Sequence, residues 1–212
     1  HKYKIILQEN IKKSAPILED EGNYPRAIIK KKQYQLDNFT DAMILNQIYS
    51  IDNERPFYSF LWAKHQIKGG LKKVEDLALR VNEPKEPNAI YPRYWHGNTF
   101  LARPLFLIGD FSQIRWLIYC FTSLMFILFC CVIYHKTNLI YALAMASGLL
   151  FVNFFVTQFS IQLSPVIVLA LLSSILICYN NQHVKRIPMI FFIFGSLTAY
   201  MDLLTTPILT LG

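Results

Sequence analysis

Two carboxylates four residues apart are the first candidates for chemistry in this sequence. On a helix, that spacing brings Asp37 and Asp41 to one face, one turn apart. Ile44, Ile48 and Ile51 continue from Asp41 at helical intervals, so Asp41 lies in line with an apolar stripe. This position favours burial and a raised pKa, and we predict that Asp41, with Asp37 beside it, acts as a general base.

The acidic pair has two further interpretations. Carboxylate oxygens are ligands of hard divalent cations such as Mg²⁺ and Mn²⁺, so Asp37 and Asp41 are also candidate metal ligands. In the simpler alternative, Asp37 caps the amino end of the helix and Asp41 interacts with the helix dipole in the first turn. A cap needs only a short polar oxygen, whereas a base needs an ionisable carboxylate.

The aromatic and basic segment Tyr91–Pro104 is the second candidate site. A helix over residues 95–108 would place His96, Thr99 and Arg103 on one face, opposite a face of leucine and isoleucine. Such an amphipathic helix is typical of a membrane interface. Pro104 in its third turn is expected to kink or end it.

Side chains of this segment suit a phosphate at the membrane surface. Arg93 and Arg103 are candidate phosphate ligands because a guanidinium fork matches phosphate oxygens in pairs. Trp95 suits the headgroup level, where aromatic side chains gather. The alternative is an ordinary membrane-surface helix whose cations lie near lipid headgroups.

Polar residues at the ends of apolar runs form the third candidate group. Gln158 and Gln162 lie four residues apart between two such runs. A carboxylate such as Asp202 would be costly facing lipid, so we expect it to face a helix bundle or an aqueous cavity. Alternatively, the run ends at Met201 and Asp202 lies in water.

Four apolar runs follow Arg115 and decide the predicted fold. A run of about 20 residues crosses the ~30 Å hydrocarbon core of a bilayer at ~1.5 Å per residue. We therefore predict an all-α fold, in which a polytopic membrane helix bundle over residues 116–212 follows a helical region over residues 1–115. The predicted spans are 116–134, 139–157, 159–179 and 187–204.

Residues 1–115 carry nearly all the charge, and their apolar residues recur at intervals of three and four, which predicts helices. Lys136, Lys185 and Arg186 are the exceptions among the 21 Lys and Arg, and Asp202 is the exception among the 14 acidic residues. Helices are expected over 10–19, 37–51, 56–67 and 71–81, with a loop over 83–88.

Loop cations set the predicted orientation. Lys136 follows the first span and Lys185 and Arg186 follow the third, whereas the loop around Gln158–Gln162 has no cation. Because Lys and Arg in short loops stay on the cytoplasmic side, we expect that loop and residues 1–115 to be extracytoplasmic. The prediction is a multi-pass protein of the cell membrane, in contact with its lipids.

Several classes of function lack their sequence signatures. Lys30–Lys32 is a single short basic run without a zinc finger or basic helix, so we predict no nucleic-acid partner. The sequence has no phosphate-binding glycine loop, no His-Glu-x-x-His motif and no Gly-x-Ser-x-Gly motif. ATP-driven, zinc-protease and serine-hydrolase activities are therefore disfavoured. All four cysteines, Cys120, Cys130, Cys131 and Cys178, lie inside the apolar runs.

The order of these features resembles bacterial integral-membrane glycosyltransferases of the C-type (GT-C) fold. In that family, a large exterior loop of helices with acidic residues precedes multiple spans. The stretches similar to it are Tyr34–Asp41, Arg93–Gly97 and Leu101–Leu105. The family usually has about twice as many spans, so the resemblance implies that this sequence is the N-terminal portion of the fold.

The resemblance implies transfer of a sugar from a polyprenyl-phosphate donor to an extracytoplasmic acceptor, sometimes with a divalent metal. Asp37 or Asp41 would deprotonate the acceptor hydroxyl, and His96 would assist as a hydrogen-bond donor. Because the family's acidic residue lies soon after its first span, Glu9 and Glu19–Glu21 are also candidate bases. The predicted substrate-binding residues are Arg93, Arg103, Trp95, Gln158, Gln162 and Asp202.

A non-catalytic protein is the alternative. In it, the exterior helices form a gate or a partner-binding surface, and the polar residues of the spans line a transport path. A structural subunit of a membrane complex fits the same features.

Overall fold

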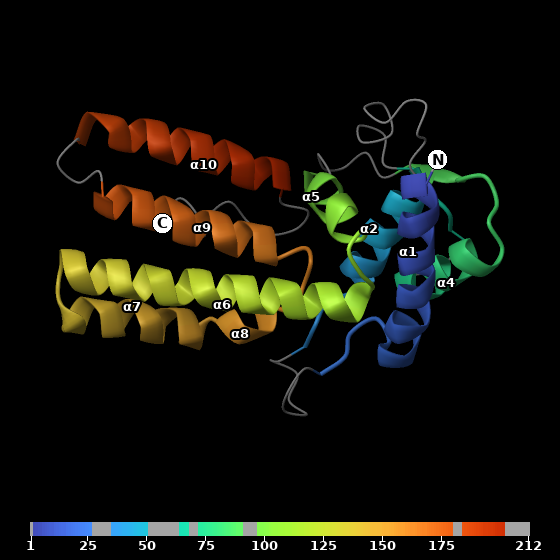
Figure 1. Ribbon diagram of the computed structural model, residues 1–212, viewed down its shortest axis with the longest axis horizontal. Helices are drawn as coiled ribbons and strands as arrows, with labels where there is room; N and C mark the ends of the chain where they lie inside the picture. Colours follow the sequence, from blue (N-terminus) through green and yellow to red (C-terminus); the bar gives the residue numbers. More distant parts are fainter. Residues whose placement is uncertain are drawn as a thin grey trace.

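The computed structural model describes residues 2–26, 35–50, 64–67, 72–90, 97–179 and 184–201. In these ranges the protein is helical apart from two short strands and one isolated bridge, which confirms the predicted all-α class. Four helices form a group that we call the cap: α1 (Lys2–Glu21), α2 (Asn38–Tyr49), α4 (Lys73–Asn82) and α5 (Gly97–Leu105). The bundle extends from it (Figure 1) and contains α6 (Phe111–Lys136), α7 (Leu139–Phe151), α8 (Phe154–Thr157), α9 (Ser164–Tyr179), the 3₁₀ turn η2 (Val184–Arg186) and α10 (Ile187–Met201).

Three of the predicted cap helices are present in the described residues, with changed ends. Helix α2 begins directly after Asp37, and α4 lies within two residues of its predicted bounds. Helix α1 begins at Lys2, eight residues before the predicted start, and Gly22 follows its last residue with φ +78°. Glycine adopts this left-handed conformation without a steric penalty, so it suits the end of a helix.

The helix predicted over residues 56–67 is wrong at its carboxyl end. Strand β1 (Lys64–His65) pairs there with strand β2 (Ala89–Ile90) in antiparallel orientation. The Asn88 side chain closes the pairing, because its amide nitrogen and oxygen bond the backbone of Ile67 at 2.8 Å each. The rest of that predicted helix lies outside the described residues.

The cap has a hydrophobic core that also includes the start of the bundle. Apolar side chains of all four cap helices pack together with Phe111 and Ile114 of α6 and with Ile161, which precedes α9. Two hydrogen bonds fasten α1 to the segment that joins α5 to α6. The Phe111 N–H donates to Ser14 Oγ at 2.9 Å, and Asn10 Nδ2 donates to the Phe106 carbonyl at 2.9 Å. The cap therefore packs directly on one end of the bundle.

Helices α6 and α7 both begin at capping residues. Asp110 accepts a hydrogen bond from the Gln113 N–H, and the Gln113 side chain accepts one from the Asp110 N–H, which is a capping box. Asn138 caps α7 by accepting from the Tyr141 N–H. The Asn138 cap lies in the tight turn between the antiparallel helices α6 and α7.

Two of the predicted spans are shorter than the apolar runs that suggested them. The run over residues 139–157 is broken at Val152 and Asn153, where Asn153 takes a left-handed conformation with φ 59°. The run over residues 159–179 begins with turns, and its helix α9 starts only at Ser164. Hydropathy alone did not show these interruptions because their neighbouring side chains are apolar.

One described helix is long and apolar enough to cross a membrane by length and composition, and it is the 26-residue α6. Helices α7, α9 and α10 are also apolar but have 13 to 16 residues. Only 22% of the most apolar part of α6 is buried within the protein. Large side chains such as Leu124, Ile140 and Phe192 are more than 60% exposed, so the sides of the bundle present an apolar surface.

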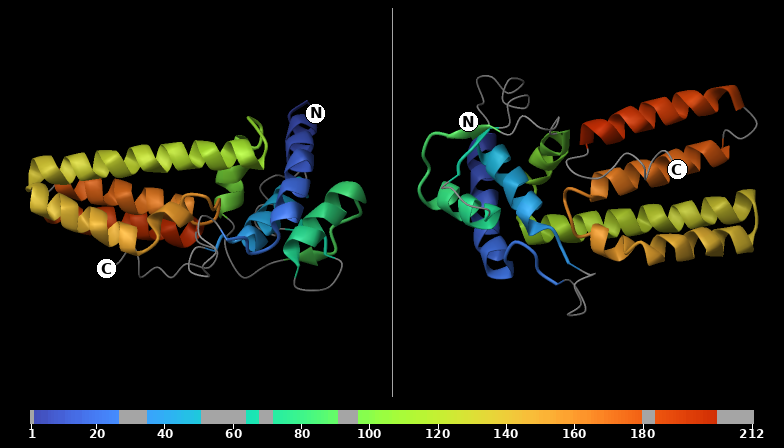
Figure 2. Two further views of the ribbon diagram at one scale, coloured as in Figure 1. Left: turned by 90° about the horizontal axis from the view of Figure 1, so that it is seen from below. Right: turned by 180° about the vertical axis from the view of Figure 1, so that it is seen from behind.

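The two cationic connections lie at the end of the bundle away from the cap. Figure 2 shows this in both views, where the turn between α6 and α7 and the start of α10 are on the far side from α1. At this end the Lys136 ammonium lies 4.7 Å from the centre of the Tyr179 ring. The turn between α8 and α9 lies at the opposite end, against the cap.

Candidate functional site

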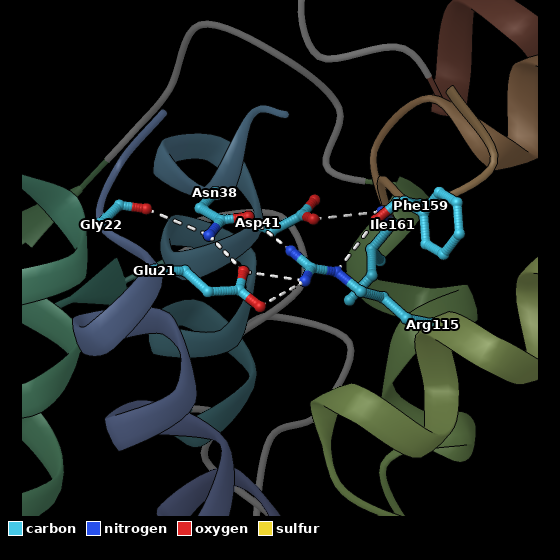
Figure 3. Close-up of polar contacts among 7 residues, drawn as sticks. All are labelled: Glu21, Gly22, Asn38, Asp41, Arg115, Phe159 and Ile161. Carbon is cyan, nitrogen blue, oxygen red and sulfur yellow. Dashed lines mark hydrogen bonds and ion pairs between the residues drawn. The ribbon is translucent and has the colours of Figure 1, made fainter. Parts of the chain in front are cut away.

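Asp41 lies where the cap meets the turn between α8 and α9. It is in the first turn of α2, and only 1% of its surface is exposed. The Gln162 N–H donates to Asp41 Oδ1 at 3.2 Å. The Ile161 N–H donates to Oδ2 at 3.3 Å (Figure 3). The Ser160 hydroxyl donates to Oδ1 at 3.4 Å. One carboxylate thus bonds three consecutive residues of a turn 120 residues away in the sequence.

Burial raises the pKa of Asp41 to about 7. Loss of hydration disfavours the ionised form, and the negative charge of Asp37 acts in the same direction. The positive charge of Arg115 and the two backbone N–H donors favour ionisation and oppose part of the increase. A carboxyl with a pKa near 7 exchanges a proton readily at neutral pH, as a general base must. The predicted burial and raised pKa of Asp41 are confirmed.

Arg115 joins the elements around Asp41. Its guanidinium donates to both oxygens of Glu21 at 2.8 and 2.9 Å, to Asn38 Oδ1 at 2.5 Å, and to the Phe159 carbonyl at 3.2 Å (Figure 3). The guanidinium carbon also lies 4.2 Å from the centre of the Phe111 ring. Arg115 is only 8% exposed, so its charge is balanced inside the protein by Glu21.

Glu21 and Asn38 complete this network. Asn38 Nδ2 donates to Glu21 Oε2 at 2.9 Å and to the Gly22 carbonyl at 3.0 Å. The end of α1 and the start of α2 therefore bind the same guanidinium, that of Arg115. Glu21, one of the alternative candidates for the base, is in an ion pair here.

Asp37 is the residue that caps the amino end of helix α2. Its Oδ1 accepts from the Thr40 N–H at 3.1 Å, and its Oδ2 accepts from the Thr40 hydroxyl at 2.7 Å. The capping interpretation of Asp37 is therefore confirmed, and both of its oxygens are occupied. Among the described residues, no group of three His, Cys, Asp or Glu side chains is placed to hold a metal ion.

Gln158 and Gln162 are both buried beside the site. Gln158 Nε2 donates to the hydroxyls of Thr122 and Ser123 of α6 at 3.0 Å each. The side-chain oxygens of Gln158 and Gln162 have no hydrogen-bond partner in the described part of the protein. The two glutamines thus lie beside the Asp41 turn, as expected from their shared loop, and each keeps an unused acceptor.

The second candidate segment is described only from Gly97 onward. Arg93, Trp95 and His96 lie outside the described residues, as does Asp202 of the third group. Helix α5 ends at Leu105, directly after Pro104, as the sequence predicted. Thr99 is buried and Arg103 is half-buried, and burial lowers the pKa of Arg103 from its usual value.

The opposite face of α5 is exposed. Leu101 is 39% exposed, and Ile108, in the turn that follows the helix, is 76% exposed. The polar face of the predicted amphipathic helix therefore points into the protein, whereas Leu101 and Ile108 of its apolar face are exposed and Leu105 packs against the core. Asn98 lies on the inner side, with both polar atoms of its amide buried and without a partner among the described residues.

An apolar cavity of about 680 Å³ lies next to the Asp41 turn. Its walls come from α5, α6, α9 and α10, and Ile161 contributes from the turn itself. The Ile161 N–H bonds Asp41, so one residue connects the cavity wall to the carboxylate. The cavity has the size of a small-molecule binding site.

Sequence reasoning missed Arg115 and Asn38 as parts of the site, and it predicted Glu21 as a candidate base rather than as the ion-pair partner of Arg115. Arg115 was interpreted as the last residue before a span, although it lies in the second turn of α6 and points into the cap. A cation that begins an apolar helix is a weak signal, because such residues also anchor helices at membrane surfaces. The partner Glu21 lies 94 residues away in the sequence.

Comparison with known proteins gives no relative for this site. No family model matches the chain, and no curated protein or solved structure has significant similarity to it.

Proposed function

We propose that the protein is a multi-pass membrane protein with its cap on the extracytoplasmic side. The apolar sides of the bundle, including a 26-residue helix of which only 22% of the most apolar part is buried, support insertion into lipid. The cationic connections at the far end support a cytoplasmic position for that end. The cap, with most of the charged residues, then lies outside.

Within that setting, we propose a glycosyltransferase that uses a polyprenyl-phosphate-linked sugar. Asp41 takes the proton of the acceptor hydroxyl, whose oxygen bonds the anomeric carbon as the bond from that carbon to the phosphate breaks. The polyprenyl phosphate leaves with the negative charge, near Arg93 and Arg103. The observation that carries this proposal is a buried carboxyl with a pKa of about 7, one residue from an apolar cavity.

Replacing the carboxyl tests this function. Asp41→Asn keeps the shape and removes the proton acceptor, so transfer from a labelled polyprenyl-phosphate sugar should fall by at least ~10²-fold, the usual contribution of a general base. Asp37→Asn is the matched control, because asparagine caps a helix as well as aspartate does and turnover should stay near the wild-type value. Wild-type turnover by a folded Asp41→Asn protein would contradict the role of Asp41 as the base.

A structural role for Asp41 is the second candidate function, and one observation favours it. Its two oxygens already accept three hydrogen bonds from residues 160–162, so the carboxylate fastens the cap to the bundle. In a non-catalytic membrane transport protein or partner-binding subunit, that fastening would be its whole contribution. The wild-type protein would then transfer no sugar from any polyprenyl-phosphate donor, and Asp41→Asn would change only stability and partner binding.

A further inference from the structure

We infer that the cavity between α5, α6, α9 and α10 binds the hydrocarbon chain of one amphiphile, with an uncharged hydrogen-bonding group of that molecule next to Asn98. The wall is almost entirely apolar, and no charged residue of the described chain lines it. Burying a charge there would be costly, so the part of the ligand that enters is neutral.

The cavity opens where a lipid chain would arrive. Leu117 and Phe121 of α6 line the cavity, and they are also 47% and 50% exposed. Leu197 of α10 lines the opposite side and is 38% exposed. The wall of the cavity is therefore continuous with the apolar surface of the bundle, and a chain can enter sideways without crossing a polar region.

Helix α5 lines the cavity at the cap end, where it also makes a close contact with α10. A Cβ added at Gly97 would lie 2.6 Å from Cδ1 of the Tyr200 ring, so only glycine allows this approach. The next residue, Asn98, lines the cavity. Asn98 is therefore the neighbour of whichever end of the ligand lies toward the cap.

Unused polar atoms around this end support a hydrogen-bonding group on the ligand. Both amide atoms of Asn98 are buried without a partner among the described residues. Buried polar groups are normally paired, and an unpaired one lowers stability. A hydroxyl or similar neutral group, which both donates and accepts, is matched to the Asn98 amide.

This site does not require Asp41 to act as a base, and its test has no turnover readout. The probe is a 16-carbon alcohol with a mid-chain diazirine, photolysed with the purified full chain in nanodiscs and mapped by peptide mass spectrometry. We expect adducts on α5, α9 or α10, which excess unlabelled hexadecanol should reduce at least tenfold. Val168→Trp, which fills the cavity from α9, should remove them. Leu143 of α7 is 60% exposed and does not line the cavity, so Leu143→Trp is the matched control and should label as the wild type does.

Asn98→Leu tests the polar end of the ligand. Wild-type protein should prefer hexadecanol over hexadecane as a competitor, and Asn98→Leu should lose that preference while still binding both. The variant should also melt at a higher temperature without ligand, because it removes an unpaired buried amide. Undiminished labelling of a folded Val168→Trp protein would overturn the site. An unchanged preference in Asn98→Leu would overturn the assignment of the neutral group.

Discussion

Asp41 combines complete burial with hydrogen bonds from backbone donors, and these act on its charge in opposite directions. Burial is the larger effect and raises its pKa, whereas Arg115 and the N–H groups of Ile161 and Gln162 partly restore ionisation. The carboxyl is therefore partly protonated at neutral pH. The fastening between cap and bundle then depends on pH through a single residue.

The pH dependence of stability follows from this raised pKa. The folded protein holds the Asp41 proton up to a pKa of about 7, above the ordinary value of 3.8. The stabilisation by the protonated carboxyl is therefore complete below pH ~4 and is lost as the pH rises through 7. The unfolding free energy of wild type minus that of Asp41→Asn should decrease by on the order of 4 kcal/mol between pH 4 and 8. Chemical denaturation of both proteins across this range measures the difference, and parallel curves would contradict the shift.

Short-range sequence patterns predicted the local structure around the site. They could not predict the contacts between residues far apart in the sequence. The capping of α2 by Asp37 and the burial of Asp41 follow from spacing within one helix, and both were predicted. The contacts of Arg115 with Glu21 and Asn38 join residues 94 and 77 positions apart, and no local pattern encodes them. The break at Asn153 was hidden because a single left-handed residue leaves the hydropathy of a run unchanged.

At the scale of the elements, Arg115 fastens α1, α2 and the α8–α9 turn to α6. Arg115→Lys keeps the charge but loses the planar fork, so one ammonium cannot bond Glu21, Asn38 and the Phe159 carbonyl in the same geometry. We expect a loss of about 2–3 kcal/mol in unfolding free energy, since hydrogen bonds of charged groups contribute ~1.5–3 kcal/mol.

The matched control for Arg115→Lys is Lys72→Arg. Lys72 directly precedes α4 and forms an exposed ion pair with Glu75 of that helix. That pair is in water, so its exchange should leave the unfolding free energy nearly unchanged. Denaturant titrations of both variants give the comparison. If Arg115→Lys and Lys72→Arg have equal unfolding free energies, the buried network adds nothing to stability beyond the charge of Arg115.

At the scale of the whole molecule, the arrangement of the bundle gives a prediction of topology. The connection with Lys136 and the turn with Lys185 lie at the end opposite the cap (Figure 1). The proposed orientation therefore puts this end in the cytoplasm and the cap outside.

Cysteine labelling in intact cells tests this orientation, in a protein without its four native cysteines. A cysteine at exposed Lys72 of the cap should react with a membrane-impermeant thiol reagent, and a cysteine at exposed Thr137 should react only after the cells are opened. The reverse pattern would place the cap in the cytoplasm. That result would rule out an extracytoplasmic acceptor.

The early end of α7 has a consequence for the surrounding lipid. At ~1.5 Å per residue, the 26 residues of α6 span about 39 Å and the 13 residues of α7 span about 20 Å. In the proposed membrane setting, a helix this short leaves a hydrophobic mismatch with a ~30 Å core, which bilayers relieve by thinning. Lipid beside α7 would then be compressed, and short acyl chains would collect on that side of the protein.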